Sequence, residues 1–331
     1  MSTALVLGAG GLTGQAFHLG VLSALQELTG FDGRRADILV GTSAGSLVAA
    51  GLGGGISAAD MIAELTGETL SPEGAALRAQ HVPARAVEDL RPVARGPLDV
   101  AVLLSAARRP FGTRPAAVVS SLLPRGRTST EPIARSLRAL HGDTWPDRDL
   151  RICAVRTRDA RRVVFGTEGA PECDVGTAVA ASCAIPGYFT PVEIGGQVFV
   201  DGGVHSPTNA DVVRHDQPEH VIVLSPMSAG PRPGPRADLP VRLAVRRYLA
   251  LEVRRLRRSG SLVTVFQPSA QDLVVMGMNP MRGGLAEDVL AVTAQSVRAR
   301  LEARPELVDA LVQQNAPGGR RNVRETPKHP V

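Results

Sequence analysis

Short apolar runs alternate with glycine-rich turns and amphipathic segments along the first part of the chain. Ala4–Leu7 is an apolar run that predicts a buried strand, and Gln15–Leu28 carries apolar residues at helical spacing. A second apolar run, Asp37–Val40, leads into small residues that predict another helix. This order of elements is typical of an α/β protein with a mostly parallel sheet.

The same pattern continues through the rest of the chain. Further strands are predicted over Arg151–Val155, Val163–Gly166, Gln197–Val200, Val221–Leu224 and Leu262–Phe266. Further helices are predicted over Ala58–Leu65, Asp174–Ser182, Val241–Arg258 and Leu285–Leu301, the last of which we expect to be the final helix. We therefore expect a single α/β domain over residues 1–315, with a central sheet covered by helices on both faces. Residues 316–331 are polar and rich in Arg and Pro, which predicts a disordered tail.

Repeated prolines interrupt the pattern over residues 70–132, where only short apolar pieces such as Val100–Ala107 and Ala116–Leu123 remain. A long irregular region beside a catalytic core often forms a cap or lid. An irregular helical layer explains the same pattern, so both interpretations stay open.

Composition narrows the class of protein. The 331 residues are 44% hydrophobic, which is enough for a sizeable core, and only 3% aromatic. Few aromatics argue against a surface that stacks nucleic-acid bases, so no nucleic-acid partner is expected. The formal net charge of +5 suits anionic partners such as a phospholipid surface. The basic, amphipathic segment Val241–Arg258 fits either peripheral contact with an anionic membrane or ordinary packing on the sheet.

Cysteine usage predicts neither a disulfide framework nor a structural metal. The three cysteines, Cys153, Cys173 and Cys183, show no metal-ligand spacing. Met1–Gln26 lacks charged residues, but its glycines fit a buried strand–loop–helix unit better than a signal peptide or a membrane span. We expect a cytoplasmic protein.

The segment Gly41-Thr42-Ser43-Ala44-Gly45 follows the second predicted strand. A sharp strand-to-helix turn at Gly-x-Ser-x-Gly exposes the serine Oγ at the end of the strand. Gly41 and Gly45 permit this turn because they lack a Cβ. Ser43 is therefore the candidate nucleophile, and a glycine-rich turn with a structural serine is the alternative.

The first glycine-rich loop, residues 8–14, permits two interpretations. A dinucleotide site would need an acidic residue at the end of the second strand, and none stands there. An oxyanion hole needs backbone N–H groups at a helix start, which Gly10, Gly11 and Leu12 would supply, with Gly14 following.

A serine nucleophile needs a base. The seven histidines are His18, His81, His141, His205, His215, His220 and His329. Of these His205 is the best candidate, whereas His18 fits a packed residue, and His215 and His220 fit a solvated loop. Asp201 is stronger, because it ends an apolar strand before Gly202 and Gly203, at the sheet edge where catalytic groups collect. A turn aspartate is the alternative.

Taken together, these motifs resemble those of the patatin-like phospholipases. The family combines a glycine-rich opening loop, a Gly-x-Ser-x-Gly elbow and a distant Asp-Gly-Ala/Gly, here Asp201-Gly202-Gly203. Gly20-Val21-Leu22 and the run Ala180–Phe189 also match, and Val221–Leu224 and Asn279-Pro280-Met281 are similar more weakly.

The resemblance implies a three-layer patatin-like fold and a Ser43–Asp201 dyad that needs no histidine. It also implies an oxyanion hole from Gly10, Gly11 and Leu12, hydrolysis of a lipid or ester substrate through an acyl-enzyme, and no cofactor. Two positions depart from the family: Ala9 replaces a glycine, and Thr13 stands where members commonly have a basic residue. Thr13 motivates an alternative, a binding protein that hydrolyses poorly, and a dinucleotide-dependent oxidoreductase is a third class.

Overall fold

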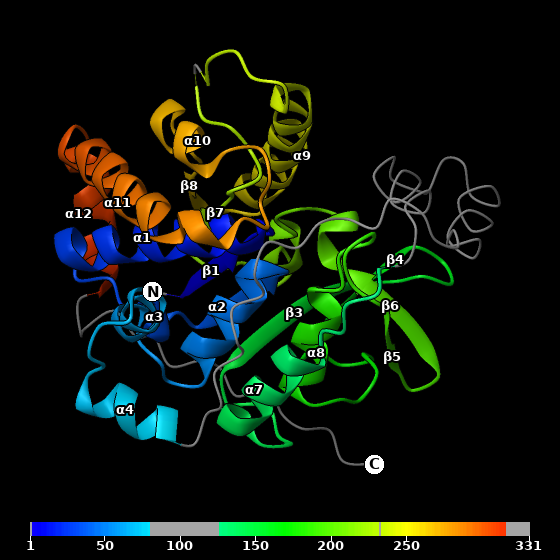
Figure 1. Ribbon diagram of the computed structural model, residues 1–331. Helices are drawn as coiled ribbons and strands as arrows, with labels where there is room; N and C mark the ends of the chain where they lie inside the picture. The colour runs from blue at the N-terminus through cyan, green and yellow to red at the C-terminus, as the bar shows by residue number, and fades with distance from the viewer. Residues whose placement is uncertain (1, 80–125, 232, 316–331) are drawn as a thin grey trace.

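The computed structural model describes residues 2–79, 126–231 and 233–315 of the chain. Figure 1 shows a central sheet with helices packed on both faces. The strands are β1 (Thr3–Leu7), β2 (Ile38–Thr42), β3 (Asp149–Arg156), β4 (Arg161–Phe165), β5 (Val192–Ile194), β6 (Gln197–Asp201), β7 (His220–Leu224) and β8 (Leu262–Phe266). The predicted α/β class with a mostly parallel sheet is therefore confirmed.

The described α-helices frame this sheet. They are α1 (Gly11–Thr29), α2 (Ala44–Gly53), α3 (Ala58–Thr66), α4 (Pro72–Ala79), α7 (Glu131–His141), α8 (Val175–Ser182), α9 (Leu239–Arg258), α10 (Ala270–Met276), α11 (Ala286–Glu302) and α12 (Pro305–Asn315). Short 3₁₀ turns are η1 (Gly33–Arg35), η2 (Gly202–Val204), η3 (Ala210–Val213) and η4 (Gly283–Leu285).

The sheet order is β5-β6-β3-β2-β1-β7-β8, and β4 pairs with β3 outside this path. The pairs from β3 through β2, β1 and β7 to β8 are parallel, whereas β4, β5 and β6 are joined by antiparallel pairs. Every residue of the inner parallel strands β1, β2 and β7 is buried, as expected for strands covered on both faces, whereas the edge strand β8 begins with the exposed Leu262.

Strand β3 is longer than β2, and the extra length accommodates β6. β2 pairs with β3 as far as Cys153, and β6 pairs with Ala154 to Arg156. β4 pairs with Ile152 to Arg156, so it occupies the opposite edge of β3 along both stretches. β2 and β6 therefore share one edge of β3 and run toward each other, and their carboxyl ends meet.

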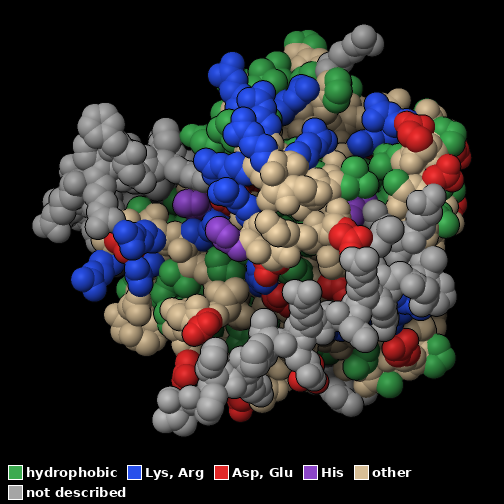
Figure 2. All heavy atoms as spheres, turned by 180° about the vertical axis from the view of Figure 1, so that it is seen from behind, with side chains coloured by type: hydrophobic (Ala, Val, Ile, Leu, Met, Phe, Trp, Pro, Cys, Tyr) green, Lys and Arg blue, Asp and Glu red, His purple; other side chains and the backbone are tan. Residues whose placement is uncertain are grey.

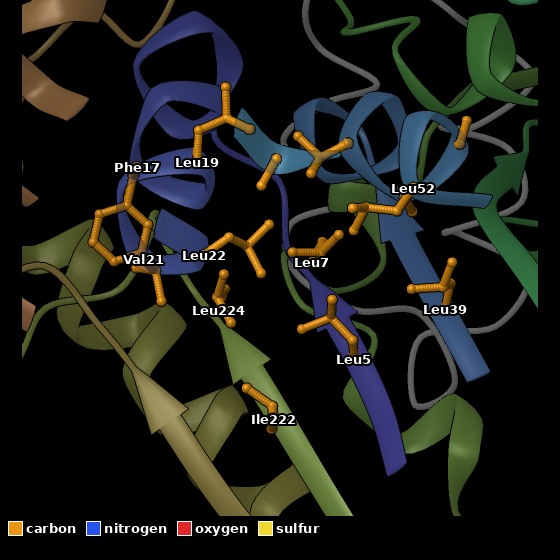
Figure 3. Packing of buried hydrophobic residues seen from close by; sticks show 14 of the residues in the cluster. Leu5, Leu7, Phe17, Leu19, Val21, Leu22, Leu39, Leu52, Ile222 and Leu224 are labelled. Atoms are coloured by element: carbon orange, nitrogen blue, oxygen red, sulfur yellow. The ribbon is translucent and has the colours of Figure 1, made fainter. Parts of the chain in front are cut away.

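The larger core lies between the sheet and helices α1, α2, α8 and α11. Figure 3 shows Leu5, Leu7, Leu39, Ile222 and Leu224 of the strands packed against side chains of α1 and α2. A second core on the opposite face joins the strands to α9 and η3. Burial of these apolar faces holds both helical layers on the sheet.

The structure changes several sequence expectations. α1 begins at Gly11, four residues before the predicted start, so the last four residues of the expected loop form the first turn of the helix. The helix predicted to be the last corresponds to α11, but α12 follows it. His220 was expected in a solvated loop, whereas it lies buried in β7 and contacts Thr264 Oγ1 at 2.8 Å.

Other expectations fall where the structure gives less. Most of the predicted cap, including Val100–Ala107 and Ala116–Leu123, lies outside the described residues, as does the predicted tail over residues 316–331. The single domain over residues 1–315 therefore stays a prediction. Helix α9 packs on the sheet through Val245, Leu249 and Leu256, as ordinary packing requires.

Candidate active site

Ser43 stands at a sharp turn between β2 and α2. Its backbone has φ 54° and ψ −123°, a region that non-glycine residues rarely adopt. Such strain persists only where the surroundings enforce it, and it is typical of the nucleophile elbow. The Ser43 carbonyl accepts hydrogen bonds from Ser46, through the amide at 2.8 Å and the hydroxyl at 2.6 Å. The residue is 3% exposed.

Gly41 and Gly45 are required by close packing around this turn. A Cβ at Gly41 would overlap the Cα of Ser46, and a Cβ at Gly45 would overlap the carbonyl oxygen of Leu7. The second contact brings the start of α2 against the end of β1, where the glycine-rich loop begins. The two glycines therefore place the elbow beside that loop.

Asp201 lies next to the turn at Ser43, but the strand that carries it pairs differently from what we expected. We expected it at the carboxyl edge of a parallel sheet, but β6 is antiparallel to β3. Asp201 lies opposite Ala154, one residue beyond Cys153, and Cys153 pairs with Thr42. The Asp201 side chain thus comes next to the end of β2 because β6 approaches β2 end to end.

The Asp201 carboxyl is 4% exposed, and burial raises its pKa to about 7. The nearby Ser43 hydroxyl and the Gly203 amide favour the ionised carboxylate and so lower this pKa in part. Oδ1 accepts from the Gly203 N–H at 2.7 Å. Oδ2 has no well-formed hydrogen bond with any described residue. The Ser43 hydroxyl is thus a close neighbour of the carboxyl, without a hydrogen bond of good geometry between them.

Gly202 and Gly203 fit the same crowded corner. A Cβ at Gly202 would overlap the carbonyl oxygen of Cys153, and a Cβ at Gly203 would lie 3.3 Å from the Cβ of Ala9. Ala9 belongs to the opening loop, so the turn after Asp201 packs against that loop. The three sequence motifs converge on one place.

The opening loop presents a run of unused backbone amides. The amides of Gly8, Ala9, Thr13 and Gly14 donate to carbonyl oxygens of Leu224, Pro207, Pro280 and Gly10. Between them, the amides of Gly10, Gly11 and Leu12 have no backbone acceptor among the described residues. Gly11 has φ +61°, and a Cβ there would lie 2.5 Å from the carbonyl oxygen of Pro280. These amides lie at the start of α1, where the helix dipole is positive.

His18 holds the opening loop through a hydrogen bond to its first residue, Gly8. It is fully buried in α1, and its Nε2 lies 2.7 Å from the carbonyl oxygen of Gly8. Burial lowers the pKa of His18 to about 4, so the ring is neutral at pH 7 and donates from Nε2. This agrees with the prediction of a packed residue.

Ser182 and Asn209 contact the elbow, and the sequence had not singled out either. The Ser43 amide donates to Ser182 Oγ at 2.9 Å, and Ser182 Oγ donates to the carbonyl of Cys153 at 2.7 Å. Asn209, in the left-handed region at φ 51°, donates from Nδ2 to Thr42 Oγ1 at 3.0 Å. A buried serine in the run Ala180–Phe189 was the one available signal for Ser182.

Glu252 of α9 holds the segment that carries Asn209. Its carboxylate accepts hydrogen bonds from the hydroxyls of Ser206 and Thr208 at 2.6 Å each, and from the Ala210 amide at 3.1 Å. Glu252 belongs to the segment Val241–Arg258, whose sequence gave no sign of this role. Its burial at 2% exposure shows instead a fixed polar anchor on the inner face of α9.

Fold and elbow define an α/β protein with a serine at a strained strand-to-helix turn. A family model described as patatin-like phospholipase matches residues 5–214, more than half of the 331 residues. The chain belongs to the patatin-like phospholipase family, as the motifs predicted, and the dinucleotide-binding interpretation falls away. A comparison with curated proteins gives no match.

Solved structures similar to this chain include the following two. The type III effector protein ExoU is 17% identical with a TM-score of 0.37, over 92% of this chain and 53% of that chain. VipD from Legionella pneumophila is 14% identical with a TM-score of 0.42, over 95% of this chain and 67% of that chain. The chain thus spans about half the length of the ExoU chain. In the described part of the protein, no helix is both long and apolar enough to cross a membrane.

Proposed function

We propose that the protein hydrolyses carboxylic esters of lipids, with Ser43 as nucleophile and Asp201 as base. The observation that carries the proposal is the closeness of a serine at a strained elbow to a buried carboxyl whose pKa is about 7. A carboxyl with that pKa is ionised in part at neutral pH and remains basic enough to accept a proton.

The proposed reaction has two stages, acylation of Ser43 and hydrolysis of the acyl-serine. Asp201 accepts the proton of the Ser43 hydroxyl as Oγ attacks the ester carbonyl, and the carbonyl oxygen becomes an oxyanion facing Gly10, Gly11 and Leu12. The C–O bond breaks, and the leaving alcohol takes the proton from Asp201. Water then attacks the acyl-serine, Asp201 accepts its proton, and the carboxylic acid leaves as Ser43 regains its hydrogen. These steps use no cofactor.

A membrane surface is the source of substrate that we propose. Val274 and Met278 are 78% and 65% exposed, the largest fractions among the exposed large hydrophobic residues of the described chain. The segment after Met278 contacts the start of α1, where the Thr13 amide donates to Pro280 at 3.2 Å. Met278 precedes this contact by two residues, Val274 lies on α10 just before it, and the exposed Arg282 follows it. A lipid surface touching this end would present its esters to Ser43.

A fluorophosphonate probe and ester turnover test the chemistry. We expect labelling at Ser43, no labelling or turnover in Ser43→Ala, and loss of turnover in Asp201→Asn with a normal fold. Ser261→Ala and Asp143→Asn are matched controls away from the elbow and should behave as wild type. Substantial activity in Asp201→Asn would contradict the dyad and return attention to His205.

A second candidate is a lipid-binding protein of the same fold with weak hydrolysis. Thr13 favours it, because this residue is 1% exposed and brings no charge to the start of α1. Lipid binding without probe labelling at Ser43 would select this alternative.

A further inference from the structure

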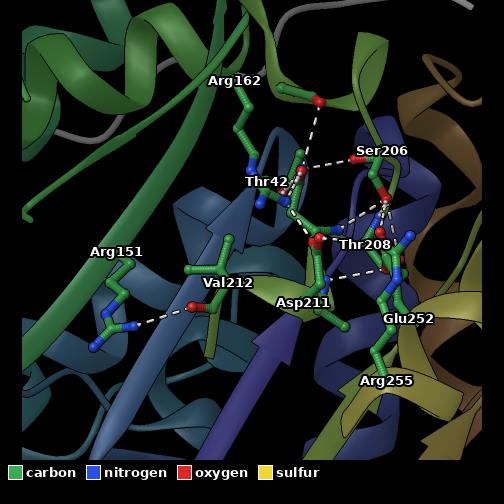
Figure 4. Close-up of polar contacts among 12 residues, drawn as sticks. Thr42, Arg151, Arg162, Ser206, Thr208, Asp211, Val212, Glu252 and Arg255 are labelled. Atoms are coloured by element: carbon green, nitrogen blue, oxygen red, sulfur yellow. Dashed lines mark hydrogen bonds and ion pairs between the residues drawn. The ribbon is translucent and has the colours of Figure 1, made fainter. Parts of the chain in front are cut away.

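A cavity of about 270 Å³ lies away from Ser43, on the face of the sheet that carries η3 and α9. Its walls come from β3, β4, η3 with the following loop, and the second half of α9. The charged and titratable side chains that line it are Arg151, Arg162, Asp211, Arg214, His215 and Arg255. Figure 4 shows Arg151 beside Val212 on one side of the view and Arg162, Asp211 and Arg255 on the other, and Figure 2 shows basic side chains gathered beside histidine on the back of the molecule.

Two of the arginines are held rigidly in the wall. Arg151 binds Asp149 at 2.7 Å and Asp216 at 2.6 Å, and its side chain is 10% exposed. Arg162 binds Asp211 at 2.5 Å, and its side chain is 19% exposed. Fixed guanidinium groups lose little freedom when they accept a further anionic partner.

The other two arginines that line the cavity, Arg214 and Arg255, are more exposed and less fully paired with carboxylates. Arg255 is 49% exposed and reaches Asp211 only at 3.7 Å, sharing that carboxylate with Arg162. Arg214 is exposed and forms no ion pair with another described residue. His215 beside it adds a further donor. Several guanidinium groups around one small cavity are the arrangement that proteins use to recognise phosphate.

We propose that this cavity binds a phosphate group, either a free phosphate or the phosphate of a lipid headgroup. Arg214 and Arg255 bind the phosphate oxygens directly, and Arg151 and Arg162 hold the wall in place. Its volume accommodates a phosphate with a small ester substituent. Phosphate binding here does not require the proposed hydrolysis, because among the described residues no hydrogen bond or ion pair joins Arg214 or Arg255 to Ser43 or Asp201.

The side chain of Asn209 connects Arg162, in the wall of the cavity, to the turn at Ser43. Arg162 donates to Asn209 Oδ1 at 3.1 Å, and Asn209 donates to Thr42 and, at 3.4 Å, to the carbonyl of Gly202. Thr42 and Gly202 flank Ser43 and Asp201 in sequence. A bound phosphate would thus stand behind the residues that position both candidate catalytic groups.

Calorimetric titration of the full-length protein with inorganic phosphate and with glycerol 3-phosphate tests the site. We expect saturable binding of at least one ligand, weakened tenfold or more in the double variant Arg214→Gln/Arg255→Gln. The matched control Arg254→Gln/Arg258→Gln removes the same charge from the neighbouring surface of α9 and should bind as wild type. Ser43→Ala should also bind as wild type, which separates this site from the opening-loop amides.

Each outcome decides the proposal. Preference for glycerol 3-phosphate would indicate a lipid headgroup, and equal binding would indicate phosphate itself. Absence of binding to wild type, unchanged binding by Arg214→Gln/Arg255→Gln, or an equal loss in the control double variant would overturn the assignment. Circular dichroism of each variant establishes that the fold is intact.

Discussion

The amide of Ser43 is fastened to the hydroxyl of Ser182, which in turn is fixed by the carbonyl of Cys153. α8 therefore holds the strained elbow from the side, and β3 holds α8. The elbow depends on a residue 139 positions away in the sequence.

Removal of that hydroxyl should loosen the elbow. Ser182→Ala leaves the buried Ser43 amide without its acceptor, which costs about 1–3 kcal/mol of unfolding free energy. We expect kcat to fall with little change in KM, because Ser43 loses its orientation rather than its contact with substrate. Urea unfolding and ester kinetics measure both effects. In Ser261→Ala a buried hydroxyl without a hydrogen-bond partner among the described residues is removed, so both quantities should stay at wild-type values.

The packing of Gly45 on β1 predicts a severe effect of one methyl group. Gly45→Ala would drive a Cβ into the Leu7 carbonyl, and backbone cannot yield as a flexible side chain does. We expect destabilisation of about 3 kcal/mol or more, in the range of severe core overpacking. Thermal unfolding should show this directly. Gly284→Ala, where no atom lies within 4 Å of the added Cβ, should be nearly neutral, and a stable Gly45→Ala protein would contradict the tight packing.

Activity should depend on the ionisation of Asp201. Because burial raises its pKa to about 7, the carboxyl is mostly protonated below that pH and cannot then act as the proposed base. We expect kcat/KM on a soluble ester to rise with pH through a midpoint near 7 and then level off. A midpoint near 4 would show that the carboxyl is not desolvated in the working enzyme.

The same pKa makes a prediction about stability. The folded chain binds the Asp201 proton more tightly than the unfolded chain, so stability is lost as pH rises from about 4 to above 7. Raising a pKa from 3.8 to about 7 corresponds to roughly 4 kcal/mol. Asp201→Asn cannot ionise, so its unfolding free energy relative to wild type should increase between pH 5 and pH 8. Urea unfolding at the two pH values measures the difference, and a parallel pH dependence of both proteins would contradict it.

A comparison of lipid vesicles with soluble esters should separate membrane docking through Val274 and Met278 from ester hydrolysis itself. In Val274→Ser/Met278→Ser, apolar area that would contact lipid is lost, so we expect turnover of vesicle phospholipid to fall severalfold. Turnover of a short soluble ester should stay unchanged. Leu262→Ser is the matched control, because this 52%-exposed leucine begins β8 at the opposite end of the sheet. Equal losses in both variants would argue against docking through Val274 and Met278.

Most strands and helices of the described fold could be predicted from the local pattern of apolar residues. β8 was predicted with both bounds as observed, and β7 and α9 were found within two residues, because apolar periodicity reports burial directly. The end of an apolar strand at Asp201 indicated a place at the sheet edge, and family resemblance indicated its pairing with Ser43. Its cause, the pairing of β6 with the overhang of β3, is a long-range register that no local pattern contains.

The sequence also did not predict which buried polar residues fix the site. Glu252, Asn209 and Ser182 look unremarkable in sequence, because their partners come from distant segments. His220 misled for a related reason: charged neighbours in sequence suggested solvent, while the strand that it begins is covered on both faces.

The end-to-end meeting of β2 and β6 makes the proposed pairing of Ser43 with Asp201 sensitive to the number of residues in a strand. Successive side chains of a strand point to opposite faces, so Asp201 shares its face with Phe199 and not with Val200. Insertion or deletion of one residue between Phe199 and Asp201 would turn the carboxyl toward the α9 side of the sheet. The residue count of β6 is therefore as much a requirement of this corner as the identity of Asp201 itself.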